Sequence, residues 1–158
     1  MWRHSLRLGA AAFAIVATSQ AALAQQFGPA ERQAVLDRIA ALSQGDLEQI
    51  LTVVIPDFVG MLNRGMPARL DEVTTATAVT YAPTVVEYTY QIDEGVTFGP
   101  GMIDEQKAIL VRTLCNQEDT FYILALGVTM MYHYRGAKAD IGTFDIVIAD
   151  CPASTPTK

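Results

Sequence analysis

The sequence predicts an α+β domain in which an N-terminal helical pair precedes a ββαββ unit, an antiparallel sheet packed on one helix and closed by one disulfide. Three observations predict this class. Apolar residues recur at helical spacing up to Leu62, and the period changes to two from Leu70. Two runs with period two flank a further helical segment. The only two cysteines, Cys115 and Cys151, both lie in this second half. Helices segregated from mostly antiparallel strands are typical of the α+β class.

Residues 1–24 predict a secretory signal peptide. Arg3 and Arg7 form a basic start, an apolar run follows, and Ala-Leu-Ala at residues 22–24 has the form of a cleavage site. The apolar run has about ten residues, whereas a membrane-spanning helix needs roughly 20. We therefore expect a periplasmic or secreted protein with no membrane span in the mature chain. An uncleaved membrane anchor is the alternative.

Residues 25–152 are expected to form one domain, and residues 153–158 a flexible tail. Cleavage after Ala24 leaves 134 of the 158 residues, a length that suits a single core. These residues include nine basic and 17 acidic side chains, so the net charge is −8 with histidine neutral. Nucleic-acid binding uses clustered basic residues. Since the sequence has no such cluster, we expect no nucleic-acid partner.

Two helices are expected before the sheet. Pro29 is typical of a first helical turn, and Gly45 of a helix end. The second helix runs from Leu47 to Leu62, and Pro56 inside it predicts a kink or a break. The helix is apolar over more than half of its circumference, which predicts either packing between a sheet and another helix or a partner-binding surface. The candidate partner surface consists of the apolar residues outside the main stripe, Val53, Ile55 and Val59.

Two hairpins are expected on either side of a third helix. β-branched and aromatic residues alternate over residues 73–81 and 86–92, with a turn at Ala82-Pro83 between them. The third helix begins near Ile103 and carries Cys115. Residues 128–135 and 143–149 alternate again, with Cys151 at the end of the last strand. The strand tyrosines fall on the side predicted to face the core.

Cys115 and Cys151 are expected to form a disulfide, because both belong to the mature part of an exported chain. This bond would tie the third helix to the far edge of the sheet. Two free thiols or a shared metal ion are the alternatives, and the oxidising compartment favours the disulfide.

Few residues could carry chemistry. The mature chain has one histidine, His133, and two serines, Ser43 at a helix end and Ser154 in the tail. A nucleophile needs a base beside it, and a zinc site at His133 would need both cysteines as thiolates. We therefore expect no enzyme, no catalytic residue, no metal site and no cofactor. The alternative is a small-ligand carrier or an enzyme on the polar sheet face, around Glu87, His133 and Asp145.

The order of several short motifs resembles a known group of proteins. The motifs are Pro67-x-Arg69-x-Asp71-Glu72-x-Thr74, Tyr88-x-Tyr90, the Cys115 helix, Gly127-Val128-Thr129-x-x-Tyr132-x-Tyr134, and Ile146-x-Ile148-x-x-Cys151. They resemble small exported bacterial α+β domains, and the layout is similar to that of the disulfide-closed pilotins, which escort secretin subunits of type II secretion. Pilotins are typically lipoproteins, whereas this sequence has no cysteine near residue 24.

The resemblance covers residues 67–151 and implies a fold and a role. It implies a non-enzymatic periplasmic binding or accessory protein with a protein partner in the envelope. Its motifs are turn glycines, core tyrosines and a cysteine pair, which are structural residues. Because these motifs do not indicate a binding site, the expected partner surface remains Val53, Ile55 and Val59 of the second helix.

Overall fold

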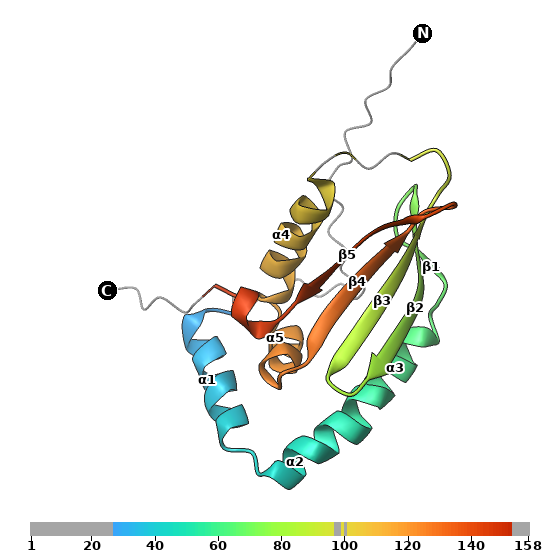
Figure 1. Ribbon diagram of the computed structural model, residues 1–158. Helices are drawn as coiled ribbons and strands as arrows, with labels where there is room; N and C mark the ends of the chain where they lie inside the picture. Colours follow the sequence, from blue (N-terminus) through green and yellow to red (C-terminus); the bar gives the residue numbers. More distant parts are fainter. Residues whose placement is uncertain (1–26, 97–98, 100, 153–158) are drawn as a thin grey trace, which may run out of the picture.

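The structure is a computed structural model that describes residues 27–96, 99 and 101–152 (Figure 1). The predicted signal peptide and the predicted tail lie outside these residues. The first elements are α1 (Pro29–Ala40), α2 (Gln44–Gln49), the π-helical turn η1 (Ile50–Val54) and α3 (Ile55–Asn63). Next come β1 (Ala68–Arg69), β2 (Thr74–Ala82), β3 (Val85–Ile92), α4 (Met102–Leu114) and α5 (Glu118–Ala125). The last elements are β4 (Thr129–Arg135), β5 (Asp140–Ile146) and the 3₁₀ turn η2 (Ile148–Asp150).

The five strands form one mixed sheet in the order β1-β2-β3-β4-β5. Both predicted hairpins, β2–β3 and β4–β5, are antiparallel, which confirms the α+β class with a ββαββ unit. The junction between the hairpins differs from the prediction, because β3 and β4 are parallel, with Tyr88 opposite Tyr132. Between these strands the chain crosses over through α4 and α5, which carry it back to the end of the sheet where β3 begins, so that β4 runs in the same direction as β3.

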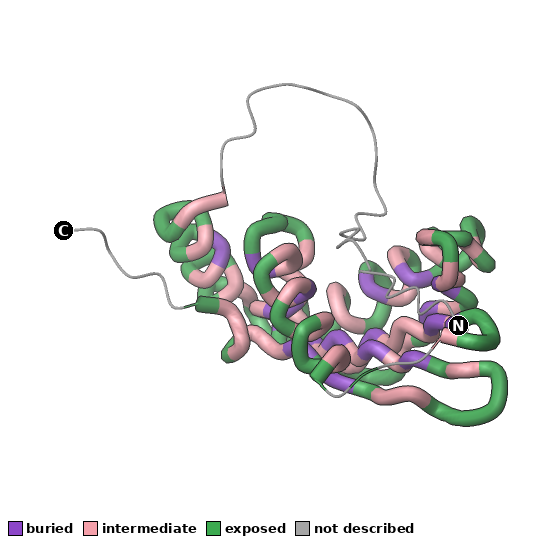
Figure 2. Tube along the Cα trace, turned by 90° about the horizontal axis from the view of Figure 1, so that it is seen from above, coloured by how far each residue is buried: buried purple, intermediate pink, exposed green. Residues whose placement is uncertain are grey.

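All the helices of the described chain lie on one side of the sheet (Figure 2). α3 packs on β2, α4 packs on β5, and α1 packs on α5. The prediction placed the sheet on one helix. Five strands at a spacing of about 4.8 Å are about 19 Å wide, and a helix is only about 10 Å across, so one helix cannot cover the sheet.

Aromatic side chains fill the space between the sheet and the helices. Strand alternation turns Met130, Tyr132 and Tyr134 inward, and each is at most 4 % exposed. The Tyr132 ring stacks on Tyr88, at 5.1 Å between ring centroids, and on Phe144, at 5.2 Å. Such cross-strand ring pairs stabilise a sheet beyond the area they bury. These tyrosines are therefore core residues.

Pro56 interrupts the second helix, as the sequence predicts, and the interruption is a π turn. The Ile55 N–H donates to the carbonyl of Ile50, five residues back. Proline has no N–H and its ring crowds the preceding turn, which a wider turn relieves. The wider turn holds one additional residue, so the residues after it are rotated by about 100° compared with a straight α-helix.

The edge of the sheet beyond β1 is covered by a side chain. β1 has only two residues and pairs with Thr75 and Ala76 of β2. Further along β2, the Asn63 side-chain amide donates to the carbonyl of Val79, and the Val79 N–H donates to Asn63 Oδ1. Asn63 thus satisfies backbone groups that a longer edge strand would otherwise bind.

The last strand has the predicted length but begins and ends three residues earlier than the predicted 143–149. β5 ends at Ile146, and the chain then turns through η2, where the Val147 N–H donates to Asp150 Oδ2 at 3.0 Å. Alternation of apolar residues continues to Ile148, so periodicity alone does not reveal this end of the strand. Within the described ranges, every helix is too short or too polar to cross a membrane.

Candidate functional site

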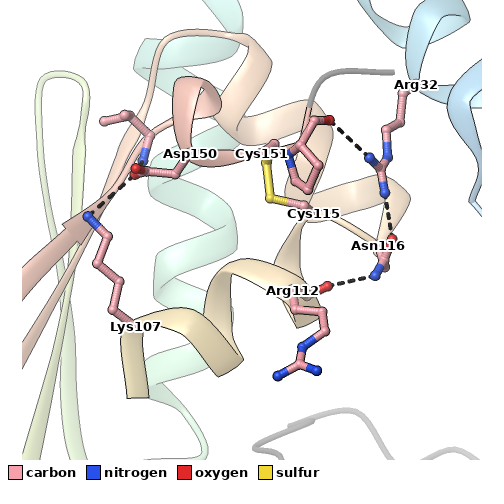
Figure 3. The surroundings of a disulfide bond; sticks show 9 residues. Arg32, Lys107, Arg112, Cys115, Asn116, Asp150 and Cys151 are labelled. Atoms are coloured by element: carbon pink, nitrogen blue, oxygen red, sulfur yellow. Dashed lines mark hydrogen bonds and ion pairs between the residues drawn. A yellow bond between two sulfur atoms is a disulfide. The ribbon is translucent and has the colours of Figure 1, made fainter. Parts of the chain in front are cut away.

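The structure contains the predicted disulfide between Cys115 and Cys151, with a Cα–Cα distance of 5.5 Å (Figure 3). Cys115 is the C-cap of α4 and Cys151 is the C-cap of η2. The bond therefore joins α4 to the turn that follows the edge strand. The prediction placed Cys151 on the strand itself, and the early end of β5 explains the difference.

The surroundings of the disulfide join α1 to the same corner. Arg32 of α1 donates to Asn116 Oδ1 at 2.6 Å and to the Pro152 carbonyl at 3.3 Å, and Lys107 lies 3.6 Å from Asp150 (Figure 3). A hollow of about 570 Å³ lies beside these residues. These polar groups bind one another, so the corner is a structural joint between three elements.

His133 lies on the face of the sheet that carries no helix. Its Nδ1 lies 3.4 Å from Glu87 Oε1, and its Nε2 lies 3.3 Å from Asp140 Oδ1. The structure therefore brings Glu87 and His133 together, as predicted, and Asp140 takes the place expected for Asp145. Both ring nitrogens already face carboxylates of the protein. Action as a base or as a metal ligand would require breaking one of these contacts.

The predicted partner surface of Val53, Ile55 and Val59 is wrong as a single patch. Val53 is 50 % exposed, whereas Ile55 is 2 % and Val59 6 % exposed. Ile55 and Val59 pack in a core cluster with Val79. The prediction expected a kink or a break at Pro56, and it grouped these residues because they lie outside the main apolar stripe of the helix. The rotation introduced by the π turn directs Ile55 and Val59 to the sheet and leaves Val53 outside.

A second hollow, which we call the junction hollow, lies between the second helical segment and the β2–β3 turn. Its volume is about 590 Å³. Helix residues and hairpin residues both contribute to its wall, so neither element forms it alone. The lining residues are Gln44, Leu47, Glu48, Leu51, Thr52, Pro56, Tyr81, Pro83 and Thr84.

A hydrogen bond fixes the two walls of the junction hollow to each other. In an α-helix the Leu51 carbonyl would accept from Ile55, whose N–H is bound to Ile50. In a π turn it would accept from Pro56, which has no N–H. The Tyr81 hydroxyl supplies the missing donor at 2.7 Å. The π turn thus creates a free carbonyl, and the hairpin satisfies it.

The β2–β3 turn is held in place from the other side. Thr84 has a φ of 67°, in the left-handed region, and its carbonyl accepts from the Thr129 N–H of β4 at 2.8 Å. A threonine in this conformation requires support from neighbouring structure. The β2–β3 turn is therefore held in one backbone conformation, and it forms a fixed wall of the junction hollow.

The chemistry of the junction hollow is that of a binding surface. Leu47, Leu51, Pro56 and Pro83 are apolar, and Glu48 is its one carboxylate. Burial raises the pKa of Tyr88 and of Tyr134 to about 12, and both rings lie elsewhere, in or against the aromatic core. Among residues 27–96, 99 and 101–152, no three His, Cys, Asp or Glu side chains are grouped to hold a metal ion. The surface that lines the hollow is therefore mainly apolar, with one carboxylate at its wall.

Sequence reasoning missed the hairpin half of the junction hollow. Leu47, Leu51 and Pro56 were visible as helix residues, whereas Tyr81 and Pro83 were assigned to a strand and a turn. The one available signal is Pro56 itself, because a proline inside a helix leaves a carbonyl that needs a donor from elsewhere.

The fold and its covalent link define a small, disulfide-closed α+β domain with an apolar hollow at one end. No family model and no curated protein matches the sequence. Among solved structures, the chain is similar to the pilotin EpsS of the Vibrio vulnificus type 2 secretion system, with 17 % identity and a TM-score of 0.57. The similarity covers 69 % of this chain and 98 % of that one.

Two further structures share the fold. A secreted protein of Pseudomonas aeruginosa has 16 % identity and a TM-score of 0.58, over 71 % of this chain and 100 % of that one. The type II secretion system pilotin AspS of Vibrio cholerae has 12 % identity and a TM-score of 0.55, over 68 % and 97 %. The layout similar to pilotins, expected from the sequence motifs, is confirmed at the level of the fold.

Proposed function

We propose that the protein is a non-enzymatic accessory protein of the periplasm that binds a secretin subunit, as the resemblance to pilotins implies. One observation carries the proposal. The chain matches two structures described as pilotins of type II secretion systems over 98 % and 97 % of their lengths. The junction hollow supports it, because an apolar, open site with a single carboxylate suits a peptide segment.

Binding would use apolar anchors of the partner. A leucine or phenylalanine side chain placed between Leu51 and Pro83 would bury its surface against both walls of the junction hollow. Full burial of one such side chain contributes about 1.5–3 kcal/mol. Micromolar binding requires about 8 kcal/mol, so we expect the partner segment to present more than one anchor.

The periplasmic location rests on the signal-peptide pattern and on the disulfide. The test is mass spectrometry of the protein isolated from the periplasmic fraction. We expect a chain that begins at Gln25 and has two cysteines that alkylating reagents modify only after reduction. A chain retained in the cytoplasm with Met1 in place would contradict the location.

The binding test uses the mature protein and the secretin subunit from the same genome, labelled with a fluorophore, in an anisotropy titration. Thr52→Trp fills the junction hollow from an exposed position. Gln49→Trp places the same ring on an exposed position of the same helical segment, and Gln49 does not line the hollow. We expect binding by the wild type and by Gln49→Trp, and a dissociation constant raised about tenfold or more by Thr52→Trp.

Circular dichroism of both variants checks that the fold is kept. If the wild type does not bind the secretin subunit, the pilotin-like role is wrong. If it binds and Thr52→Trp binds equally well, the role stands and the junction hollow is not the binding site.

A further inference from the structure

The outward face of one helical segment carries all three exposed large apolar side chains of the described chain. Val53 is 50 %, Val54 52 % and Met61 55 % exposed. All three belong to η1 and α3. Single exposed apolar residues are common on protein surfaces, whereas three on one segment form a face that is typically covered. This outer face excludes Ile55 and Val59, which face the sheet, and the residues that line the junction hollow.

The outer face continues as a regular stripe. Residues 54, 57, 60/61 and 64 follow the i, i+3, i+6/i+7, i+10 spacing of one side of a helix, and Val53 precedes them in the π turn. Gly60 lies in the middle, and a Cβ added to it would have no atom within 4 Å, so the stripe has a notch there. The long side chain of Met61 stands beside this notch.

Two opposite charges lie at equal distances from the midpoint between Gly60 and Met61. Asp57 and Arg64 are exposed, and neither side chain makes an ion pair or a hydrogen bond within the described residues. Each lies 3.5 residues from the midpoint between Gly60 and Met61, which is about 5 Å along a helix axis at 1.5 Å per residue. A reversed copy of the same stripe therefore presents Arg64 opposite Asp57 and Asp57 opposite Arg64.

We propose that the outer face binds a second copy of this chain in an antiparallel, two-fold symmetric helix pair centred between Gly60 and Met61. Met61 of each copy enters the Gly60 notch of the other, and two Asp57–Arg64 ion pairs close the contact. A two-fold interface requires a self-complementary surface, and this charge pattern is self-complementary only when the helices run in opposite directions. The proposal goes beyond the proposed function, because none of its residues lines the junction hollow.

Sedimentation equilibrium of the mature protein over a range of concentrations tests the proposal. We expect a reversible dimer. Asp57→Arg and Arg64→Asp each convert both ion pairs into like-charge contacts, so each should raise the dimer dissociation constant about tenfold or more. The double variant Asp57→Arg/Arg64→Asp restores opposite charges and should return the constant to near the wild-type value.

A second pair of variants tests the notch. Gly60→Leu should fill it, exclude Met61 and weaken the dimer, whereas Gly60→Ala should weaken it less. Since the space beside Gly60 is open in the single chain, both variants should melt at or above the wild-type temperature. A protein that is monomeric at all concentrations would overturn the proposal. A dimer dissociation constant that the single charge reversals leave unchanged would also overturn it. So would a double variant that does not return the constant to near the wild-type value.

Discussion

Reduction of the Cys115–Cys151 bond should lower the free energy of unfolding by about 4 kcal/mol. The cysteines are 36 positions apart. The chain-entropy model gives about 4 kcal/mol at 25 °C for a loop of this length, because the cross-link restricts the unfolded chain. A domain of about 130 residues has an unfolding entropy of about 0.27 kcal/mol/K, so the melting temperature should fall by about 15 °C.

The assay compares thermal melts of the oxidised and the reduced wild-type protein by circular dichroism. Reduction keeps both sulfur atoms, so it removes the cross-link without creating a cavity at Cys115, which is 1 % exposed. The double variant Cys115→Ala/Cys151→Ala is the control, and its melting temperature should not respond to the reductant. Hydrogen exchange should increase first in η2 and α1, since Arg32 binds the Pro152 carbonyl beside Cys151.

One result would refute this reasoning. If the reduced wild type melts within about 3 °C of the oxidised protein, the cross-link does not contribute through the unfolded chain as the model states. A fall in melting temperature of the alanine variant on adding reductant would show that the reductant acts elsewhere.

Three further predictions concern single side chains. Val59→Asp should lower the free energy of unfolding in urea by about 3 kcal/mol or more, because it buries an unpaired charge. Val53→Asp, at an exposed position, should change it by less than about 0.5 kcal/mol. Equal effects of the two variants would contradict the burial described above. A hydrogen bond from Arg69 holds the pKa of Asp93 below its ordinary value of 3.8, so the stabilisation is present above that pH and is lost as the pH falls through the folded pKa. Arg69→Gln should move this carboxyl pKa back toward 3.8 in an NMR titration, and an unchanged pKa would exclude Arg69 as the cause. Burial raises the pKa of Tyr88 from 10.0 to about 12, so ultraviolet absorbance should show its ionisation near pH 12 and stability should decline from about pH 10 upward; ionisation near pH 10 in the folded protein would show that the ring is solvated.

Local periodicity was sufficient for the order of the elements and for the direction of the side chains in the strands. Alternation over residues 128–135 correctly separates Tyr132 and Tyr134 from His133, because the period of a strand does not depend on its neighbours. The disulfide was also predictable, since two cysteines in a chain with a predicted signal peptide have one pairing.

The relations between elements were not predictable in this way. The parallel pairing of β3 and β4 depends on where the crossover returns, which no local pattern encodes. The prediction of the partner surface was wrong because of one local feature. One additional residue in the turn before Pro56 rotates Ile55 and Val59 into the core. The junction hollow required both its helix and its hairpin to be placed, and each was predicted alone.

The contact between Tyr81 and Leu51 makes two distant positions depend on each other. Proline at position 56 deprives the helix of a donor, and a phenol 25 residues later in the chain replaces it. With phenylalanine at 81, the ring could still pack, but the carbonyl would lose its hydrogen-bond donor. Any sequence that keeps this fold with proline at 56 must therefore keep a donor at the hairpin, whereas a sequence that loses the proline is free to change both.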